Sequence, residues 1–260
     1  MSLISAYRFS ADSCNTTVDT SDYSPSLGLG SLTGADLDCT AADDGVVSAH
    51  PNEPFRSANT MKNLNEALET KQNAYTVELW IKQPSTTSSL TYLLQIEPET
   101  PDFTSRNAPC ELGLNIFQDN SDISSPKINV DHCGTFGGSL QCWLQLKDLN
   151  YEYTDNATHL VVTVEPFGSS GSRLNVTANG VLLGTDTKGD FACNQPFRDN
   201  NVVKMLDKSP ERASDIASEL VFEGRIYAFN MFAGAQSLSD VKSRYEDGLP
   251  ALPTAYPSSV

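Results

Sequence analysis

The fold of this chain is decided by the stretch THLVVTVEPFGSSGSRLNVTANGVLLGT, residues 158–185. Residues 160–164 are rich in β-branched side chains, which favours a pleated and largely buried strand. After a Gly/Ser turn, residues 174–177 alternate between apolar and polar, as a half-exposed strand does. Asn179-Gly180 follows, a dipeptide typical of a two-residue hairpin because both positions tolerate positive φ. The stretch therefore predicts a three-stranded antiparallel meander.

The composition of the chain limits its class and its partners. Its 260 residues suit one large all-β domain. Thirty-three acidic and seventeen basic residues give a formal net charge of −16 and a pI near 4.4. This surface repels phosphate backbones, so nucleic acid is not expected as a partner. It is compatible with divalent cations, although solubility alone also accounts for it.

Cysteines and glycosylation motifs indicate the compartment. Six cysteines fit three disulfides in an oxidising environment. N-x-Ser/Thr sequons at Asn15, Asn156 and Asn175 predict glycosylation. No signal peptide opens the chain and no long apolar segment follows, so the chain is interpreted as a mature protein or a piece of a longer one. Together these features predict an extracellular or cell-surface protein.

The rest of the chain continues the β pattern. Residues 75–82 alternate, with one face carrying Tyr75 and the other carrying Trp80. Residues 222–232 are apolar on both faces, which is typical of a covered central strand. Residues 59–70 are expected to be a loop with one helical turn. Further strands are expected at residues 3–9, 90–96, 111–117, 127–132, 140–146 and 202–206.

One helix and a tail complete the expected architecture. Ser237 and Asp240 form a capping box, and Gly248 ends a helix that begins after Ser237. About a dozen short strands with one short C-terminal helix predict an all-β fold in which two antiparallel sheets form a jelly-roll sandwich. Residues 1–248 are expected to form one domain, and residues 249–260 a proline-rich linker.

Several segments also resemble the laminin-G-like and concanavalin A-like jelly-roll module, in that family's order. They are TVELWIK (76–82), THLVVTVE (158–165), LNVTANGVLLG (174–184), FEGRIYAFNMFAGAQSLSDV (222–241) and an opening AYRFSADS…VDTSD (6–22). The resemblance covers nearly the whole chain up to Gly248. It implies an adhesion or binding module of a larger extracellular protein, with calcium as the usual cofactor.

Some relatives with the same sandwich are glycoside hydrolases, which need two carboxylates across a cleft. The clustered E-x-D-x-x-E strand of those hydrolases is missing, and Glu78 stands alone in its strand. No Gly-x-Ser-x-Gly elbow, His-Glu-x-x-His pair or phosphate loop is present. His159 belongs to a strand motif and is interpreted as structural. The chain is therefore not expected to be an enzyme.

A calcium site is expected in the opening loop. A hard cation needs six to eight oxygen ligands, and carboxylates are among its preferred donors. Asp12, Asp19 and Asp22 lie where relatives carry an acidic opening motif, and Asp36 and Asp38 are possible contributors. The competing interpretation is that these acids are simply solvated.

Glycan recognition is the alternative to an adhesive role, because sugars need an aromatic platform with amide and carboxylate hydrogen bonds. Trp80 lies on the polar face of its strand, and Tyr151 and Tyr153 share one side of a loop that also holds Asp155. The other interpretation of Trp80 is packing against a cover on the outer face. The partners expected are therefore extracellular proteins, glycans or neighbouring domains of the same polypeptide.

The cysteines predict a stapled rim. Cys14 and Cys39 flank the opening acidic loop and are expected to pair. The strand directions place the other four cysteines at one rim, where they would staple a partner-binding surface. Cys133 and Cys142 face each other if the hairpin has a two-residue Gly-Gly turn, whereas a Cys110–Cys133 bond competes and requires a bulge. The four rim cysteines are Cys110, Cys133, Cys142 and Cys193.

Overall fold

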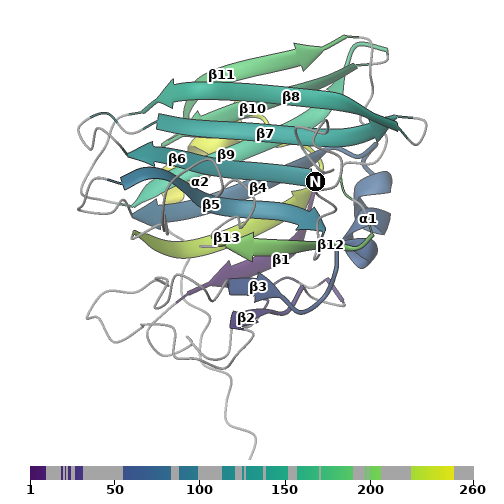
Figure 1. Cartoon of the computed structure of the whole chain (residues 1–260), viewed down its shortest axis with the longest axis horizontal. Helices are drawn as coiled ribbons and strands as arrows, with labels where there is room; N and C mark the ends of the chain where they lie inside the picture. Colours follow the sequence, from purple (N-terminus) through teal and green to yellow (C-terminus); the bar gives the residue numbers. More distant parts are fainter. Residues whose placement is uncertain are drawn as a thin grey trace, which may run out of the picture.

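The computed structural model confirms an all-β sandwich of two antiparallel sheets (Figure 1). Each sheet turns one face towards the other, and apolar side chains from both inner faces fill the space between them. The structure describes residues 1–9, 19, 21, 23–24, 27–31, 55–82, 88–98, 113–120, 125, 127–136, 139–151, 157–169, 171–189, 197, 199–205 and 224–248.

The first sheet has six strands in the order β1-β13-β4-β9-β10-β11. The strands are β1 (Ser2–Arg8), β4 (Tyr75–Lys82), β9 (Thr158–Phe167), β10 (Gly171–Ala178), β11 (Val181–Lys188) and β13 (Arg225–Ala233). Strands β1 and β13 come from opposite ends of the chain and pair side by side. The predicted covered strand is β13, which lies between β1 and β4 and is almost wholly buried.

The second sheet has seven strands in the order β2-β3-β12-β5-β6-β7-β8. The strands are β2 (Leu29–Ser31), β3 (Phe55–Ser57), β5 (Ser88–Pro98), β6 (Gly113–Asn120), β7 (Lys127–Phe136), β8 (Ser139–Asn150) and β12 (Asn201–Met205). The edge strand β8 lies next to β11, the edge strand of the first sheet (Figure 1).

The predicted meander is confirmed as β9, β10 and β11. Ala178 pairs with Val181 across the turn, where φ is 51° at Asn179 and 74° at Gly180. Both values are positive, as the hairpin motif requires. A Cβ added at Gly180 would lie 3.3 Å from the Cα of Lys242, so the turn lies close against the C-terminal helix.

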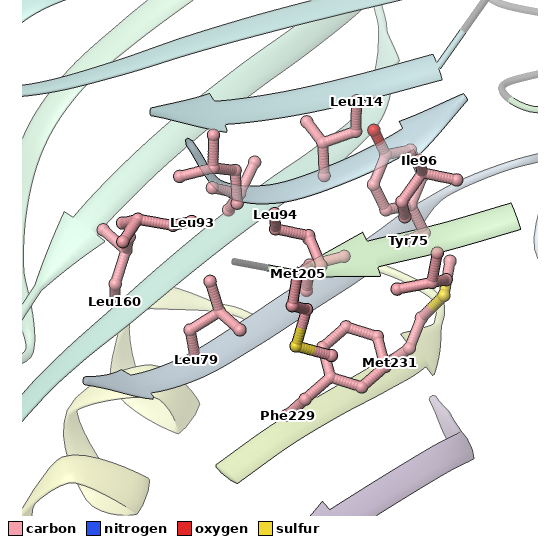
Figure 2. Close-up of a cluster of buried hydrophobic side chains, with 14 of the residues drawn as sticks. Tyr75, Leu79, Leu93, Leu94, Ile96, Leu114, Leu160, Met205, Phe229 and Met231 are labelled. Carbon is pink, nitrogen blue, oxygen red and sulfur yellow. The ribbon is translucent and has the colours of Figure 1, made fainter. Parts of the chain in front are cut away.

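The core confirms the inward face predicted for residues 75–82. Tyr75 and Leu79 are fully buried and lie among side chains from β5, β12 and β13, including Leu94, Met205 and Phe229 (Figure 2). The other face of β4 is also buried, with Trp80 only 4% exposed. The alternation therefore identified the inner face but did not show that the outer face is covered.

Two helices are described, and one of them was underestimated. α1 (Lys62–Glu69) is a two-turn helix in the region expected to be a loop with one turn. It forms because Met61, Leu64 and Leu68 have helical spacing and are buried in the core. α2 (Leu238–Asp247) has the predicted capping box at Ser237 and ends at Gly248, where φ is 84°.

Candidate functional site

A buried carboxylate attaches α2 to the outer face of the first sheet. Glu78 is 1% exposed. Its Oε1 accepts hydrogen bonds from Trp80 Nε1 at 3.1 Å and from His159 Nε2 at 2.8 Å. Its Oε2 accepts from Asn230 Nδ2 at 3.1 Å and from Arg244 Nε and Nη2 at 3.1 and 2.6 Å. Side chains from β4, β9, β13 and α2 thus meet at one anion, which we call the Glu78 cluster.

The charge of Glu78 is maintained by its partners. Burial acts to raise its pKa, but the hydrogen bond and charge of His159 and the charge of Arg244 outweigh burial and lower the pKa to about 2. The carboxylate is therefore ionised at neutral pH and already has five donors. It serves to hold α2 in place, and His159 lies in this cluster as the structural residue that its strand motif predicted.

Trp80 does not offer an exposed ring. It stacks on His159 with ring centroids 4.5 Å apart, and Tyr245 of α2 lies 6.4 Å away in a nearly parallel plane. The expectation that Trp80 forms a sugar platform is therefore wrong, because α2 covers the face on which it lies. The alternative interpretation, packing under an outer cover, is the one observed.

Tyr151 is also not a platform. It is 8% exposed and belongs to the main core, and its hydroxyl accepts a hydrogen bond from Gln118 Nε2 at 2.8 Å. Its predicted companion, Tyr153, lies outside the described residues. The side chain of Tyr151 therefore stabilises the sandwich, which corrects its assignment as a ligand residue.

Asp19 holds the edge of the first sheet. Its Oδ1 accepts hydrogen bonds from the backbone N–H groups of Ala6 at 3.0 Å and Ser21 at 2.9 Å, and its Oδ2 accepts from Ser5 Oγ at 3.1 Å. Because β1 is an edge strand, Asp19 satisfies a backbone group that would otherwise be open to another strand.

The described residues contain no group of three or more His, Cys, Asp or Glu side chains suited to a metal. The other predicted calcium ligands, Asp12, Asp22, Asp36 and Asp38, lie outside the described residues.

The register of the β7–β8 hairpin corrects the predicted cysteine geometry. Phe136 pairs with Ser139, as a two-residue turn requires, but the register shifts between Gly134 and Thr135. Cys133 consequently pairs with Trp143 and Cys142 with Gly134. The two cysteines were expected to be directly opposite and are instead one position out of register, because β8 contains an extra residue. The disulfides themselves stay predictions. Cys14, Cys39, Cys110 and Cys193 lie outside the described residues.

The register of β6 and β7 bears on the competing Cys110–Cys133 bond. Leu114 pairs with His132, and Gly113 is the residue that pairs with Cys133. The choice between the two bonds therefore stays open.

Asn175 is the only described sequon asparagine, and it lies within β10. Its Nδ2 donates to Glu165 Oε1 at 3.3 Å, and its Oδ1 accepts from Thr185 Oγ1 at 2.8 Å. The side chain is partly exposed on the outer face of the first sheet. Glycosylation at this position stays a prediction, as it does at Asn15 and Asn156, which lie outside the described residues.

A row of polar side chains crosses the outer face of the second sheet. Strand alternation points these side chains away from the core, because each lies next to an inward-facing residue of its strand. Gln95, Asp131 and Lys204 are buried, whereas Asn115 and Gln145 are partly exposed. We call this set the polar row. Its cross-strand order is Lys204, Gln95, Asn115, Asp131, Gln145.

A charge pair holds one end of the polar row, and hydrogen bonds to carboxylates hold the other. At one end, Lys204 Nζ lies 2.8 Å from Glu97 Oε1, with both side chains largely buried. At the other, Gln145 Nε2 donates to Asp131 Oδ1 at 2.6 Å, and the Gln145 backbone N–H donates to Asp186 Oδ2 of β11 at 2.9 Å. This last bond links the edges of the two sheets.

The middle of the polar row has unused acceptors. Gln95 Oε1 and Asn115 Oδ1 are buried and have no hydrogen-bond partner among the residues that the structure describes, and the two residues are a cross-strand pair. A buried acceptor without a donor costs about 1–3 kcal/mol, so these two oxygens destabilise the folded sheet. Sequence reasoning missed the polar row because its five residues come from five different strands. The only local signal was a polar residue at alternate positions of each strand.

Comparison with known proteins shows similarity of fold alone. Neither a scan against protein-family models nor a search of curated proteins finds a match. Among solved structures, the binding domain of Paraclostridial Mosquitocidal Protein 1 is similar over 95% of this chain, with a TM-score of 0.61 and 12% identity. The receptor binding domain of botulinum neurotoxin D has a TM-score of 0.57 and 15% identity, also over 95% of this chain. The binding domain of botulinum neurotoxin DC in complex with rat synaptotagmin II has a TM-score of 0.53 and 14% identity over the same share of this chain.

The chain spans about half the length of these structures, 52%, 52% and 51% respectively. The similarity is consistent with the predicted jelly-roll sandwich and does not distinguish a laminin-G-like or concanavalin A-like module in particular. Neither helix in the described part of the chain has the length and apolar character needed to cross a membrane.

Proposed function

We propose that this chain is a non-catalytic binding module of a larger extracellular or cell-surface protein, acting in adhesion or assembly. The observation that carries the proposal is the similarity of the whole sandwich to domains that are named as binding domains. One of these is in complex with a protein, rat synaptotagmin II, which supports a protein partner here. The Glu78 cluster supports the non-catalytic part of the proposal. Its buried carboxylate already accepts hydrogen bonds from five donor groups, so it is not available to act on a substrate.

The sequons and the even number of cysteines support an extracellular location. The net charge of −16 favours partners with a basic surface, because opposite charges raise the rate of encounter. Calcium bound by the opening acidic loop remains part of the proposal, with Asp19 available only by giving up its hydrogen bonds to β1.

Parallel arrays of extracellular proteins and of glycans test this function. The purified chain is expected to bind a protein saturably, and the binding should survive removal of N-glycans from that protein. Binding that disappears on deglycosylation would exclude the protein-binding proposal in favour of glycan recognition. Turnover of any substrate by the purified chain would exclude a non-catalytic module.

The second candidate function is glycan binding, favoured by the partly exposed amide side chains of the polar row. Asn115 and Gln145 are partly exposed, and amide groups can both donate hydrogen bonds to sugar hydroxyls and accept hydrogen bonds from them. On the glycan array, Asn115→Ala should abolish binding, whereas Lys147→Ala, an exposed change on β8, should leave it unchanged. Equal signals from both variants would exclude the polar row as the glycan site.

A further inference from the structure

A pocket of about 380 Å³ lies between α1 and the paired strands β1 and β13. α1 lies at the end of the sandwich where β1 begins (Figure 1). Ile4 and Ala233 are buried and form apolar walls, and Ala67 of α1 contributes another. The volume is within the range of small-ligand sites, about 300–1,000 Å³.

The polar lining of this pocket has one sign of charge. Glu66 is the only charged residue among the described residues that line it, and Tyr23 adds a phenol ring. Burial raises the pKa of Tyr23, and the nearby Glu66 carboxylate raises it further, so the two groups share one electrostatic environment. The Ser2 hydroxyl lies on the same lining. The pocket therefore combines apolar walls, an aromatic ring and a carboxylate.

An arginine side chain has the complementary chemistry. Its guanidinium pairs with a carboxylate, stacks on an aromatic ring and is more weakly hydrated than an ammonium group. Its aliphatic stem can lie against apolar walls such as Ile4 and Ala67. The net charge of −16 attracts a cationic surface to the chain before contact is made.

We propose that this pocket receives an arginine side chain of a protein partner, between Glu66 and Tyr23. The inference rests on the proposed protein-binding function and names the group that the partner presents. A single side chain is expected to bind weakly, with a dissociation constant on the order of 1 mM.

The probe is N-acetylarginine amide, with N-acetylcitrulline amide as a neutral analogue of similar shape. Binding is followed by chemical-shift changes in two-dimensional NMR of the isotope-labelled chain. The arginine probe should shift the resonances of Ser2, Ile4, Tyr23 and Ala67, and the citrulline probe should not. Glu66→Gln should weaken binding about fivefold, as expected for a largely solvated ion pair.

Glu69→Gln is the matched control, because Glu69 is an exposed carboxylate of α1 that does not line the pocket. It changes the net charge equally and should leave the affinity unchanged. Equal weakening by both variants, equal binding of the citrulline probe, or shifts confined to other residues would overturn the inference. If the chain binds a protein on the array while the arginine probe fails, the pocket inference is wrong and the proposed function stands.

Discussion

Replacing Glu78 with glutamine removes the charge at the centre of the Glu78 cluster while keeping the shape of the side chain. The amide can still accept through its oxygen, but its NH₂ group then faces donors from two of the surrounding residues. Leaving Arg244 and His159 without their carboxylate should destabilise the attachment of α2. Breaking a buried charge pair costs about 3–5 kcal/mol, and because Arg244 is one-third exposed we expect the lower end.

The pKa of Glu78 gives an independent magnitude. Lowering it from 4.5 to about 2 corresponds to about 3 kcal/mol of stability at neutral pH, at about 1.4 kcal/mol per unit. Between these two values the unfolded chain binds a proton that the folded chain does not. This stabilisation is therefore complete above pH 4.5 and is lost as the pH falls towards 2, with roughly 2 kcal/mol already lost at pH 3.

The assay is urea unfolding of the wild type and of Glu78→Gln at pH 7, 5.5, 4 and 3. The difference in free energy of unfolding should be about 3 kcal/mol at pH 7 and should shrink at acidic pH, since glutamine resembles the protonated carboxyl. Equal stability at pH 7, or a difference that stays constant down to pH 3, would refute the reasoning. The control is Glu165→Gln, which breaks a partly exposed pair with Arg173 and should cost less than about 1 kcal/mol.

Four further predictions concern other parts of the chain. Burial lowers the pKa of His132 to about 4, so stability should fall as the pH drops from 6.5 to 4, by about 3 kcal/mol; NMR titration should show a neutral imidazole at pH 5.5. Ser237→Ala removes the capping box of α2 and should cost about 1 kcal/mol in urea unfolding. Calcium at one hundred times its dissociation constant should add about 2.7 kcal/mol, and a melting temperature indifferent to both calcium and chelator would contradict the site. Non-reducing peptide mapping should find Cys14 joined to Cys39, and glycosidase treatment should remove sugar from the peptide that contains Asn175; a bond from Cys14 to Cys133, or an unmodified mass from a eukaryotic secretory host, would contradict these assignments.

Local patterns in the sequence determined the parts of the fold that depend on neighbouring residues. The Asn179-Gly180 turn follows from the backbone angles that these two residues tolerate, and the Ser237 cap from the N–H groups at a helix start. The inward face of β4 follows from its period of two. These features need only a few adjacent residues, so they are legible without the tertiary structure. α1 shows the limit of such local patterns. Its apolar residues have helical spacing in the sequence, but only their burial in the core shows that the full two-turn helix forms.

Only the tertiary structure decided which faces are covered and which distant side chains meet. Trp80 has the same place in its strand whether or not α2 lies over it, so its sequence position does not separate a sugar platform from a buried ring. The polar row depends on the register of five strands, and one extra residue in β8 was enough to move Cys142 away from Cys133. The arginine pocket likewise joins Tyr23, Glu66 and Ala233, which are far apart in the chain. Side chains that do not neighbour one another in the sequence come together only through strand register and sheet packing, and no local pattern encodes either.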